Sequence, residues 1–281
     1  MGILNITPDS FSGDGLISKP AAGLPGNKIL DLALEQAGRF LGAGADILDV
    51  GAESTRPGAP SVSAAEELDR LMPVLQALVR EYPAAVISID TYKSEVAAAA
   101  LESGAGMIND VWGLNADPLL AQVIARFEVP LILMHNRSKP GSTRVQAVLG
   151  GRYVGMEYAN LLEDVRQELM ASVKKAQAAG ISQDKIILDP GIGFGKTTAQ
   201  NLELINRLDE IRALGFPVLL GPSRKSFIGY TLNLPPQNRL EGTAAAVSIG
   251  IARGADIIRV HDVEAMVRVA RMTDAIVRPL K

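Results

Sequence analysis

Residues 85–110 read AVISIDTYKSEVAAAALESGAGMIND and contain one complete strand–helix–strand unit. The apolar run 85–90 lacks strict alternation, which is typical of a strand that is buried on both faces. Segment 92–103 predicts a helix, and a glycine turn at 104–106 leads into a second apolar strand at 107–110. Strands that are joined by a crossover helix lie parallel in one sheet, so this unit predicts an α/β fold.

The same unit recurs from one end of the chain to the other. Strands are expected at 1–5, 46–51, 85–90, 107–110, 130–135, 185–189, 217–221 and 256–260. Helices are expected at 28–41, 64–82, 92–103, 118–127, 153–179, 198–214, 239–252 and 263–276. Eight alternating units favour a closed (β/α)8 TIM barrel over the alternative of an open doubly wound sheet. We expect one domain over residues 1–281 that begins within the first strand.

Helix ends and connecting segments carry their own signals. Ser63, with Glu66 three residues later, predicts a capping box at the start of the second helix. Glycines 44, 104 and 254 predict left-handed turns after three of the helices. Segments 11–27 and 138–152 are rich in glycine and serine and are expected to be loops. They follow the first and fifth strands, at the end where barrel enzymes keep mobile catalytic segments.

The composition is that of a globular protein and excludes several classes of function. Apolar residues make up 47% of the chain, and the formal net charge of −3 gives no reason to expect nucleic acid or a membrane surface as a partner. The chain has no cysteine, so disulfides and thiolate chemistry are excluded. No signal peptide and no bilayer-spanning run is visible. We expect a cytoplasmic protein that acts on small molecules.

Every predicted strand ends in, or leads into, polar residues. In a barrel the carboxyl ends of the strands meet at one rim, which is where active sites of this fold lie. Both histidines of the chain are among these residues, although each alone reads equally well as a structural histidine. The endings are Asn5, Glu53-Ser54-Thr55-Arg56, Asp90, Asn109-Asp110, His135, Asp189, Ser223-Arg224-Lys225-Ser226, and Arg259 with His261.

The residue types divide into two kinds of chemistry. Carboxylates and an amide suit a flat heterocycle whose edge carries N–H donors and ring acceptors, and cations suit phosphate oxygens. One molecule with a heterocycle at one end and a phosphate group at the other would use both sets. The first set is Asp90, Asn109 and Asp189, and the second is Thr55, Arg56, Lys225, Arg259 and His261.

The glycine-rich run 189–197, DPGIGFGKT, is not a P-loop, because proline stands at position 190, where the first P-loop glycine is required. Its glycine spacing does not fit the dinucleotide fingerprint either. We expect a loop in which two backbone segments approach each other closely. With only two histidines, neither a Ser-His-Asp triad nor a two-histidine-carboxylate metal cluster is apparent.

Seven segments, taken together and in this order, resemble the dihydropteroate synthase family over almost the whole chain. The resemblance implies a transferase of folate biosynthesis, a class that sulfonamides target. Such an enzyme joins p-aminobenzoate to 6-hydroxymethyl-7,8-dihydropterin diphosphate, and the products are 7,8-dihydropteroate and pyrophosphate. It further implies a Mg²⁺ requirement and a homodimer with a face on the small-residue helix 242–252. The segments are GILNITPDSFS (2–12), ESTRPG (53–58), SIDTYK (88–93), IND (108–110), DPGIGFGK (189–196), SRKS (223–226) and RVHD (259–262).

The same resemblance implies a role for each site residue, and among them Asn5 would ligate Mg²⁺ together with the pyrophosphate. Loops 11–15 and 53–58 would order over the bound diphosphate. The pterin would lie against Asp90, Asn109, Met134, Asp189, Phe194 and Lys225. The diphosphate would lie against Thr55, Arg56, Arg259 and His261, and p-aminobenzoate against Phe11, Thr55, Pro57, Lys225 and Ser226. The residues that would act in catalysis are Asp189, Lys225, Arg259 and His261.

Two alternatives remain open. A pterin-dependent methyltransferase that acts on a corrinoid protein shares the barrel and the pterin contacts, although segments 223–226 and 259–261 suit a diphosphate better. A pterin-binding paralogue without catalysis belongs to a different class of function. Release of pyrophosphate in the presence of p-aminobenzoate would separate an enzyme from such a binding protein.

Overall fold

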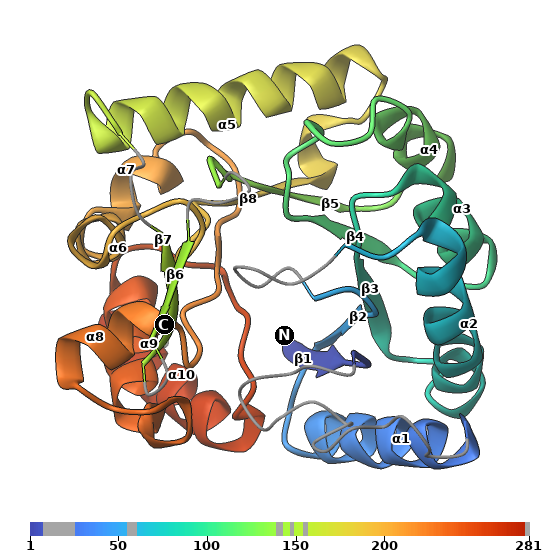
Figure 1. Ribbon diagram of the computed structural model, residues 1–281. Coiled ribbons are helices and arrows are strands. Elements are labelled where there is room, and N and C mark those ends of the chain that lie inside the picture. The colour runs from blue at the N-terminus through green and yellow to red at the C-terminus, as the bar shows by residue number, and fades with distance from the viewer. Residues whose placement is uncertain (8–25, 55–60, 139–142, 147–148, 154–156, 279–281) are drawn as a thin grey trace.

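The computed structural model describes residues 1–7, 26–54, 61–138, 143–146, 149–153 and 157–278. Strands lie at the centre of the molecule and helices surround them (Figure 1). Six strands hydrogen-bond to one another in parallel, in the order β1-β2-β3-β4-β5-β8, and β9 and β10 form a further parallel pair. The strands are β1 (Gly2–Asn5), β2 (Ile47–Gly51), β3 (Val86–Asp90), β4 (Met107–Asp110), β5 (Leu131–Met134), β8 (Ile186–Asp189), β9 (Leu219–Leu220) and β10 (Ile257–Ile258).

Two parallel bridges close these strands into a ring. Leu188 at the end of β8 pairs with Val218, which directly precedes β9. Gly2 in β1 pairs with Val260, which follows β10, and Ile3 N donates to Val260 O over 3.0 Å. The predicted (β/α)8 barrel is confirmed, and the open doubly wound alternative is wrong, because the last strand returns to the first.

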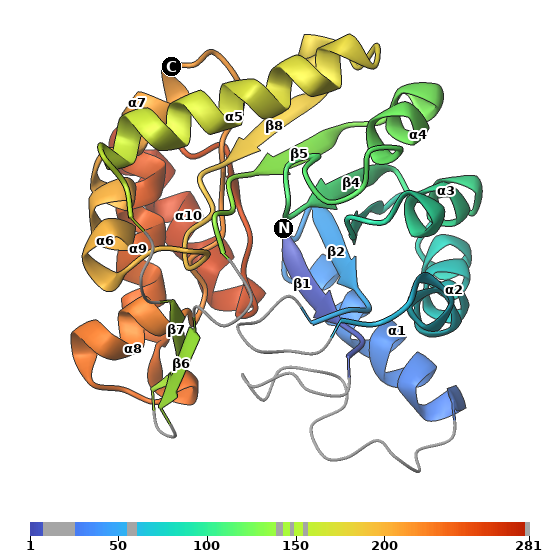
Figure 2. The same cartoon turned by 45° about the horizontal axis from the view of Figure 1, so that its top comes forward.

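The helices cover the outside of the ring in chain order (Figure 2). None of the helices within the described residues is long and apolar enough to cross a membrane. Their bounds are α1 (Gly26–Gly42), α2 (Ala64–Glu81), α3 (Ser94–Glu102), α4 (Leu120–Phe127), α5 (Leu161–Ala178), α6 (Thr198–Asn206), α7 (Leu208–Arg212), α8 (Ser226–Leu232), α9 (Leu240–Ala252) and α10 (Val263–Val277).

The predicted helix 198–214 is wrong in one respect, since the chain breaks it into α6 and α7 at Arg207. Arg207 has a φ of −115° and a ψ of 30°, outside the helical range. Its guanidinium bonds Glu203 in the first helix at 2.6 Å and Glu210 in the second at 2.7 Å. These two pairs hold the break in place.

Segment 138–152, for which the sequence predicts a loop, includes most of an antiparallel hairpin of β6 (Thr143–Gln146) and β7 (Gly150–Tyr153). The following helix begins at Leu161 and not at 153. Asn160 explains this start, because its side chain caps the helix by accepting from Glu163 N at 3.3 Å.

The predicted helix ends are mostly confirmed. Glycines 44, 104 and 254 have φ values of 96°, 101° and 101°, the left-handed conformation of a helix end. Ser63 Oγ accepts from Glu66 N at 3.2 Å. The second half of that capping box is wrong, because the Glu66 carboxylate pairs with Arg70. A complete capping box starts α6 instead, between Thr197 and Gln200.

The core has two parts, and their arrangement explains why the strands read as continuous apolar runs. A large cluster fills the space between the strands and the surrounding helices. A small cluster fills the inside of the ring, formed by Met1, Met107, Ile132, Ile187 and Leu219 with Ile47 and Ile257 packed against it. Successive strand residues face these two cores in turn. The inner cluster closes one end of the barrel, and the site lies above it.

Candidate active site

The site is the next layer of side chains inside the barrel. Side chains of a strand point to one face at every second residue. The residues that lie two positions beyond inner-core members in β2, β4, β8 and β10 are Asp49, Asn109, Asp189 and Arg259. These four side chains form a polar layer, which lies directly on the apolar inner cluster.

Arg259 joins two acids of this layer. Its Nε donates to Asp49 Oδ2 at 2.6 Å, and its Nη2 donates to Asp90 Oδ2 at 2.7 Å. Asn109 Nδ2 donates to the same Asp49 oxygen at 3.1 Å. Strands β2, β3 and β4, and the residue that directly follows β10, thus each contribute one side chain to a single hydrogen-bonded network.

Asp90 keeps an unused acceptor in this network. Its Oδ1 is buried and has no hydrogen-bond partner within the described residues. Burial raises the pKa of Asp90 to about 7, against the pull of the Arg259 guanidinium. A buried acceptor of this kind suits an N–H donor of a ligand.

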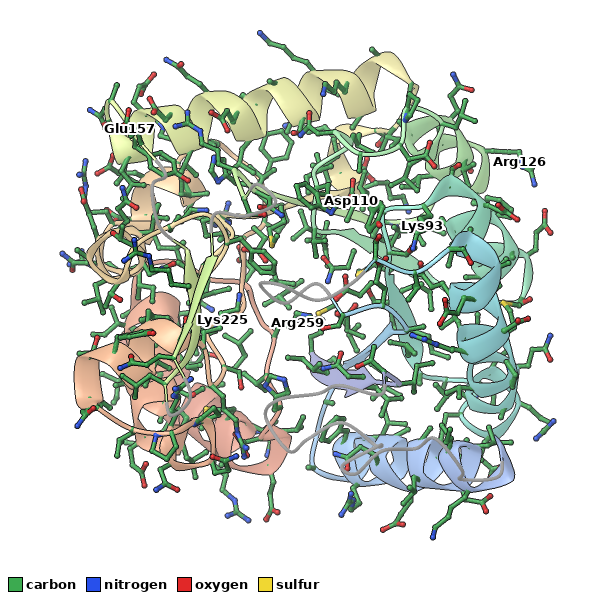
Figure 3. All side chains as sticks on the ribbon, viewed as in Figure 1. Lys93, Asp110, Arg126, Glu157, Lys225 and Arg259 are labelled. Carbon is green, nitrogen blue, oxygen red and sulfur yellow. The ribbon has the colours of Figure 1, made fainter. Side chains whose placement is uncertain are left out.

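Asp189 and Lys225 complete the charged part of the site. Burial raises the pKa of Asp189 and lowers the pKa of Lys225 to about 8, and each charge opposes the effect of burial on the other. Lys225 Nζ donates to the Ile192 carbonyl and lies 4.8 Å from the centre of the Phe194 ring. Lys225 and Arg259 both lie towards the inside of the ring of strands (Figure 3). The Lys225 ammonium group therefore lies close to both the Asp189 carboxylate and the Phe194 ring.

The glycine-rich loop after β8 is built by close backbone contact, as predicted. Gly191, Gly193 and Gly195 all have positive φ, at 71°, 84° and 60°. A side chain on Gly191 would place its Cβ only 1.9 Å from the carbonyl oxygen of His135. Gly191 N donates to Asp189 Oδ1 at 2.7 Å, so the loop also orients the carboxylate.

Lys196, at the end of this loop, binds the protein's own backbone. Its Nζ donates to the carbonyls of Gly191 at 3.0 Å and Phe194 at 2.9 Å, and it lies 2.9 Å from His135 Nδ1. The side chain is 3% exposed, and burial lowers its pKa to about 7. This lysine holds the loop together where a P-loop lysine would reach a phosphate, which agrees with the rejection of a P-loop.

His135 has the role of a structural histidine. Its ring is buried between Lys196 and Glu168, with Nε2 3.0 Å from Glu168 Oε2. Burial lowers its pKa to about 4, so the imidazole is neutral near pH 7. Arg137 Nε bonds Glu168 at 2.7 Å and holds the outer end of this chain of contacts.

His261 lies two residues beyond Arg259, at the end of the last strand. Its backbone N donates to Ser223 Oγ at 3.1 Å, and its Nδ1 lies 3.0 Å from the same oxygen. Nearby, Arg224 Nε donates to Asp262 Oδ2 at 2.8 Å. These contacts join the segments after the seventh and eighth strands, where the sequence predicts phosphate binding.

Of the remaining predicted site residues, three lie within the described part of the chain and four lie outside it. Met134 ends β5 and is buried, Ser226 is the first residue of α8, and Asn5 ends β1. Asn5 Oδ1 and Asp90 Cβ each lie 3.5 Å from the position that a Cβ of Gly51 would take. The four predicted residues Phe11, Thr55, Arg56 and Pro57 lie outside the described residues.

Asp49 is a site residue that its sequence position did not indicate, because it lies in the middle of β2 and not at the end of a strand. The signal that could have found it is the two-residue spacing along the strand: Ile47 belongs to the inner core, so the side chain of Asp49 points into the same space. A fully buried acid at such a position calls for partners.

The chain matches the family of pterin binding enzymes over residues 1–261. It is 47% identical to a dihydropteroate synthase of Clostridium beijerinckii over 99% of this chain and 94% of that protein. A Clostridium difficile dihydropteroate synthase solved with pteroic acid superposes with a TM-score of 0.87, at 43% identity over 99% of this chain and 96% of that one. A Xanthomonas albilineans dihydropteroate synthase solved with 4-aminobenzoic acid has a TM-score of 0.85 at 38% identity, and covers 100% of this chain and 93% of that one.

Proposed function

The chain belongs to the pterin-binding enzyme family, and from that membership we infer that it catalyses the dihydropteroate synthase reaction. It joins p-aminobenzoate to 6-hydroxymethyl-7,8-dihydropterin diphosphate, and the products are 7,8-dihydropteroate and pyrophosphate. The structural observation that supports the inference is the buried polar layer, in which acids, an amide and two cations share one end of the barrel.

The pterin ring, in this proposal, lies on the polar layer. Asp90, Asn109 and Asp189 offer acceptors and an N–H donor to its edge. Support comes from the unpaired Oδ1 of Asp90 and from the burial of all three side chains, which are 8%, 3% and 5% exposed. Met134 and Phe194 provide apolar contact for the flat ring, and Lys225 provides a further donor.

The diphosphate extends from the ring towards the segments after the seventh and eighth strands. Arg259 and His261 stabilise the charge of the leaving pyrophosphate, with Thr55 and Arg56 in support. The p-aminobenzoate lies outside the pterin, against Ser226, Lys225, Phe11, Thr55 and Pro57. The role of Arg259 is supported by its position, since its guanidinium lies at the polar layer with Nε on Asp49 and Nη2 on Asp90.

Asn5 would hold Mg²⁺ together with the oxygens of the bound diphosphate in this proposal. The described residues include no group of three or more His, Asp or Glu side chains that could hold a metal ion. Mg²⁺ commonly keeps several waters and takes one or two protein oxygens together with substrate phosphates, so the single amide oxygen of Asn5 fits this mode. When bound, the ion draws charge from the leaving pyrophosphate. We expect EDTA to abolish turnover and added Mg²⁺ to restore it.

The chemistry needs no nucleophile from the protein. The amine nitrogen of p-aminobenzoate forms the new C–N bond at the pterin methylene carbon. The C–O bond to the diphosphate breaks, its electron pair leaves with pyrophosphate, and the amine loses one proton. In this proposal the buried carboxylate of Asp189 stabilises positive charge that develops on the pterin methylene during departure.

Release of pyrophosphate tests the proposed function. We expect pyrophosphate to form from the pterin diphosphate only when both p-aminobenzoate and Mg²⁺ are present, with one dihydropteroate per pyrophosphate. A pterin-binding paralogue would bind the pterin and release nothing. A corrinoid-dependent methyltransferase would not use the diphosphate at all.

We also propose that the face formed by α9 and α10 makes a homodimer. Ile249 on α9 is 49% exposed, and Met272 and Ile276 on α10 are 63% and 67% exposed. The two helices pack on each other, and large exposed apolar side chains on such a face commonly mark a protein interface. We expect Ile276→Glu to give monomers in light scattering, while Leu119→Glu, at a 56% exposed position on another face, leaves the dimer intact.

A further inference from the structure

We propose that Asp49 is a positioning residue that sets the hydrogen-bond polarity of Asn109 and the direction of Arg259. It would thereby help to decide which pattern of donors and acceptors the pterin pocket accepts. The inference rests on the proposed function and deepens it, because it concerns the specificity of the same pocket.

Asp49 is buried and has two donors on one oxygen. Its side chain is 0% exposed. Its Oδ2 accepts from Arg259 Nε at 2.6 Å and from Asn109 Nδ2 at 3.1 Å, and its Oδ1 has no partner within the described residues. Taking a carboxylate out of water is costly. The Asp49 carboxylate therefore needs compensation, and these two hydrogen-bond donors, together with the charge of the Met1 ammonium group, provide it.

The chemistry of a carboxylate decides how Asn109 must turn. An ionised carboxylate accepts hydrogen bonds and cannot donate them. Asn109 therefore faces Asp49 with its Nδ2, and its Oδ1 is directed away from Asp49. The described residues give the Asn109 side chain no other hydrogen bond. Its carbonyl oxygen and its second N–H remain for a ligand, in an order that Asp49 has set.

Asparagine in place of Asp49 would remove this constraint. The oxygen of the new amide would accept from Arg259, which leaves the nitrogen of that amide to face Asn109. Asn109 would then turn its own Oδ1 towards this nitrogen and present N–H donors to the ligand. The pocket would keep its shape and lose its acceptor at this position.

Arg259 depends on the same carboxylate. With Nε held on Asp49, the guanidinium directs Nη2 to Asp90, which is 2.7 Å away. Asp49 thus influences two of the proposed substrate contacts, one to the ring and one to the diphosphate, without touching either part of the substrate itself.

A mutant cycle tests the role of Asp49, with binding of 6-hydroxymethylpterin measured by calorimetry. We expect Asp49→Asn to weaken binding about 10- to 100-fold, because a buried ligand group loses its partner. We expect Asn109→Asp alone to weaken binding as well, since two acids would face each other. The double variant exchanges the two groups: the new amide donates to the new carboxylate, whose second oxygen again faces the ligand as an acceptor. It should bind at least about tenfold more tightly than Asp49→Asn alone.

Ser88→Ala is the matched control. Ser88 lies beside Asp49 in the neighbouring strand, is 0% exposed, and its hydroxyl has no partner within the described residues. Removal of the Ser88 hydroxyl should change pterin binding less than about twofold, because no hydrogen-bond partner within the described residues is lost. Steady-state kinetics of Asp49→Asn should show a higher KM for the pterin diphosphate and an unchanged KM for p-aminobenzoate, a division that a general loss of structure would not give.

If Asp49→Asn fails to fold, the wild type itself still tests the inference. Its Asn109 side-chain amide should exchange with solvent slowly in ligand-free protein, observed by NMR on protein with ¹⁵N-labelled asparagine. Exchange at the rate of a free amide would overturn the inference, and so would a double variant that binds no better than Asp49→Asn. Release of pyrophosphate by the wild type tests the proposed function separately. If the wild type is active but the effects of Asp49→Asn and Asn109→Asp on binding simply add in the double variant, the proposed function stands and the role of Asp49 is refuted.

Discussion

Gly191→Ala should destabilise the protein far more than a typical glycine substitution at positive φ. A non-glycine residue in this conformation costs about 1–2 kcal/mol. The new Cβ would also lie 1.9 Å from the carbonyl oxygen of His135, which is backbone and cannot rotate away. That backbone is held by the bond from His135 N to Asp189 O at 2.9 Å and by Lys196. Relief of the overlap breaks two or more hydrogen bonds at about 1 kcal/mol each, which brings the total loss to about 4 kcal/mol.

Urea unfolding measures this loss against Gly180→Ala. Gly180 has a φ of 98°, and a Cβ there would meet nothing within 4 Å. The control should therefore lose only the conformational part, about 1–2 kcal/mol. Gly191→Ala should also weaken pterin binding, because Gly191 N orients the Asp189 carboxylate. Equal losses of stability in the two variants would refute the reasoning that the loop is closely packed.

Three further predictions concern Asp189, Lys196 and Arg239. Asp189→Asn should lower kcat about 10²-fold in a folded protein, because it removes charge beside the reacting methylene; near-normal turnover would remove that role. Burial lowers the pKa of Lys196 to about 7, so between about pH 7 and 10.5 the unfolded chain binds more protons and stability rises with pH. Lys196→Met should show a smaller rise than the wild type in urea unfolding between pH 7 and pH 9, because Lys225, whose pKa burial lowers to about 8, still contributes. An unchanged slope would contradict the assignment. Arg239→Met should lose about 2–4 kcal/mol, because three carbonyls including Leu149 O lose their donor. Hydrogen exchange of the β6–β7 backbone should be faster in that variant, and protection equal to wild type would argue against this link.

The strands could be predicted from the sequence because a strand that is buried on both faces appears as a short continuous run of apolar residues. Each predicted strand is confirmed to within about two residues at its ends. The hairpin β6–β7 could not be predicted in the same way. Its residues are mostly polar or glycine, and its position depends on distant contacts such as Arg239 Nη2 to Leu149 O at 3.0 Å. A sequence pattern records local periodicity and does not record such partners.

Some residues of the site could likewise be predicted from the sequence, and others could not. Asp90, Asn109 and Asp189 lie at the ends of their strands, so position alone indicated them. Asp49 belongs to the same layer, but it lies within β2, which continues to Gly51. Lys196 belongs to a glycine-rich motif, but its role is to donate hydrogen bonds to three backbone carbonyls. The spacing of residues in the sequence does not predict such contacts.

A crystal structure with pteroic acid would test the central claim most directly. We predict the pterin ring on the polar layer inside the barrel, with hydrogen bonds to Asp90, Asn109 and Asp189, and with the benzoate end towards Ser226. Pteroic acid bound outside the barrel, or a ring that leaves these three side chains without contact, would contradict the account.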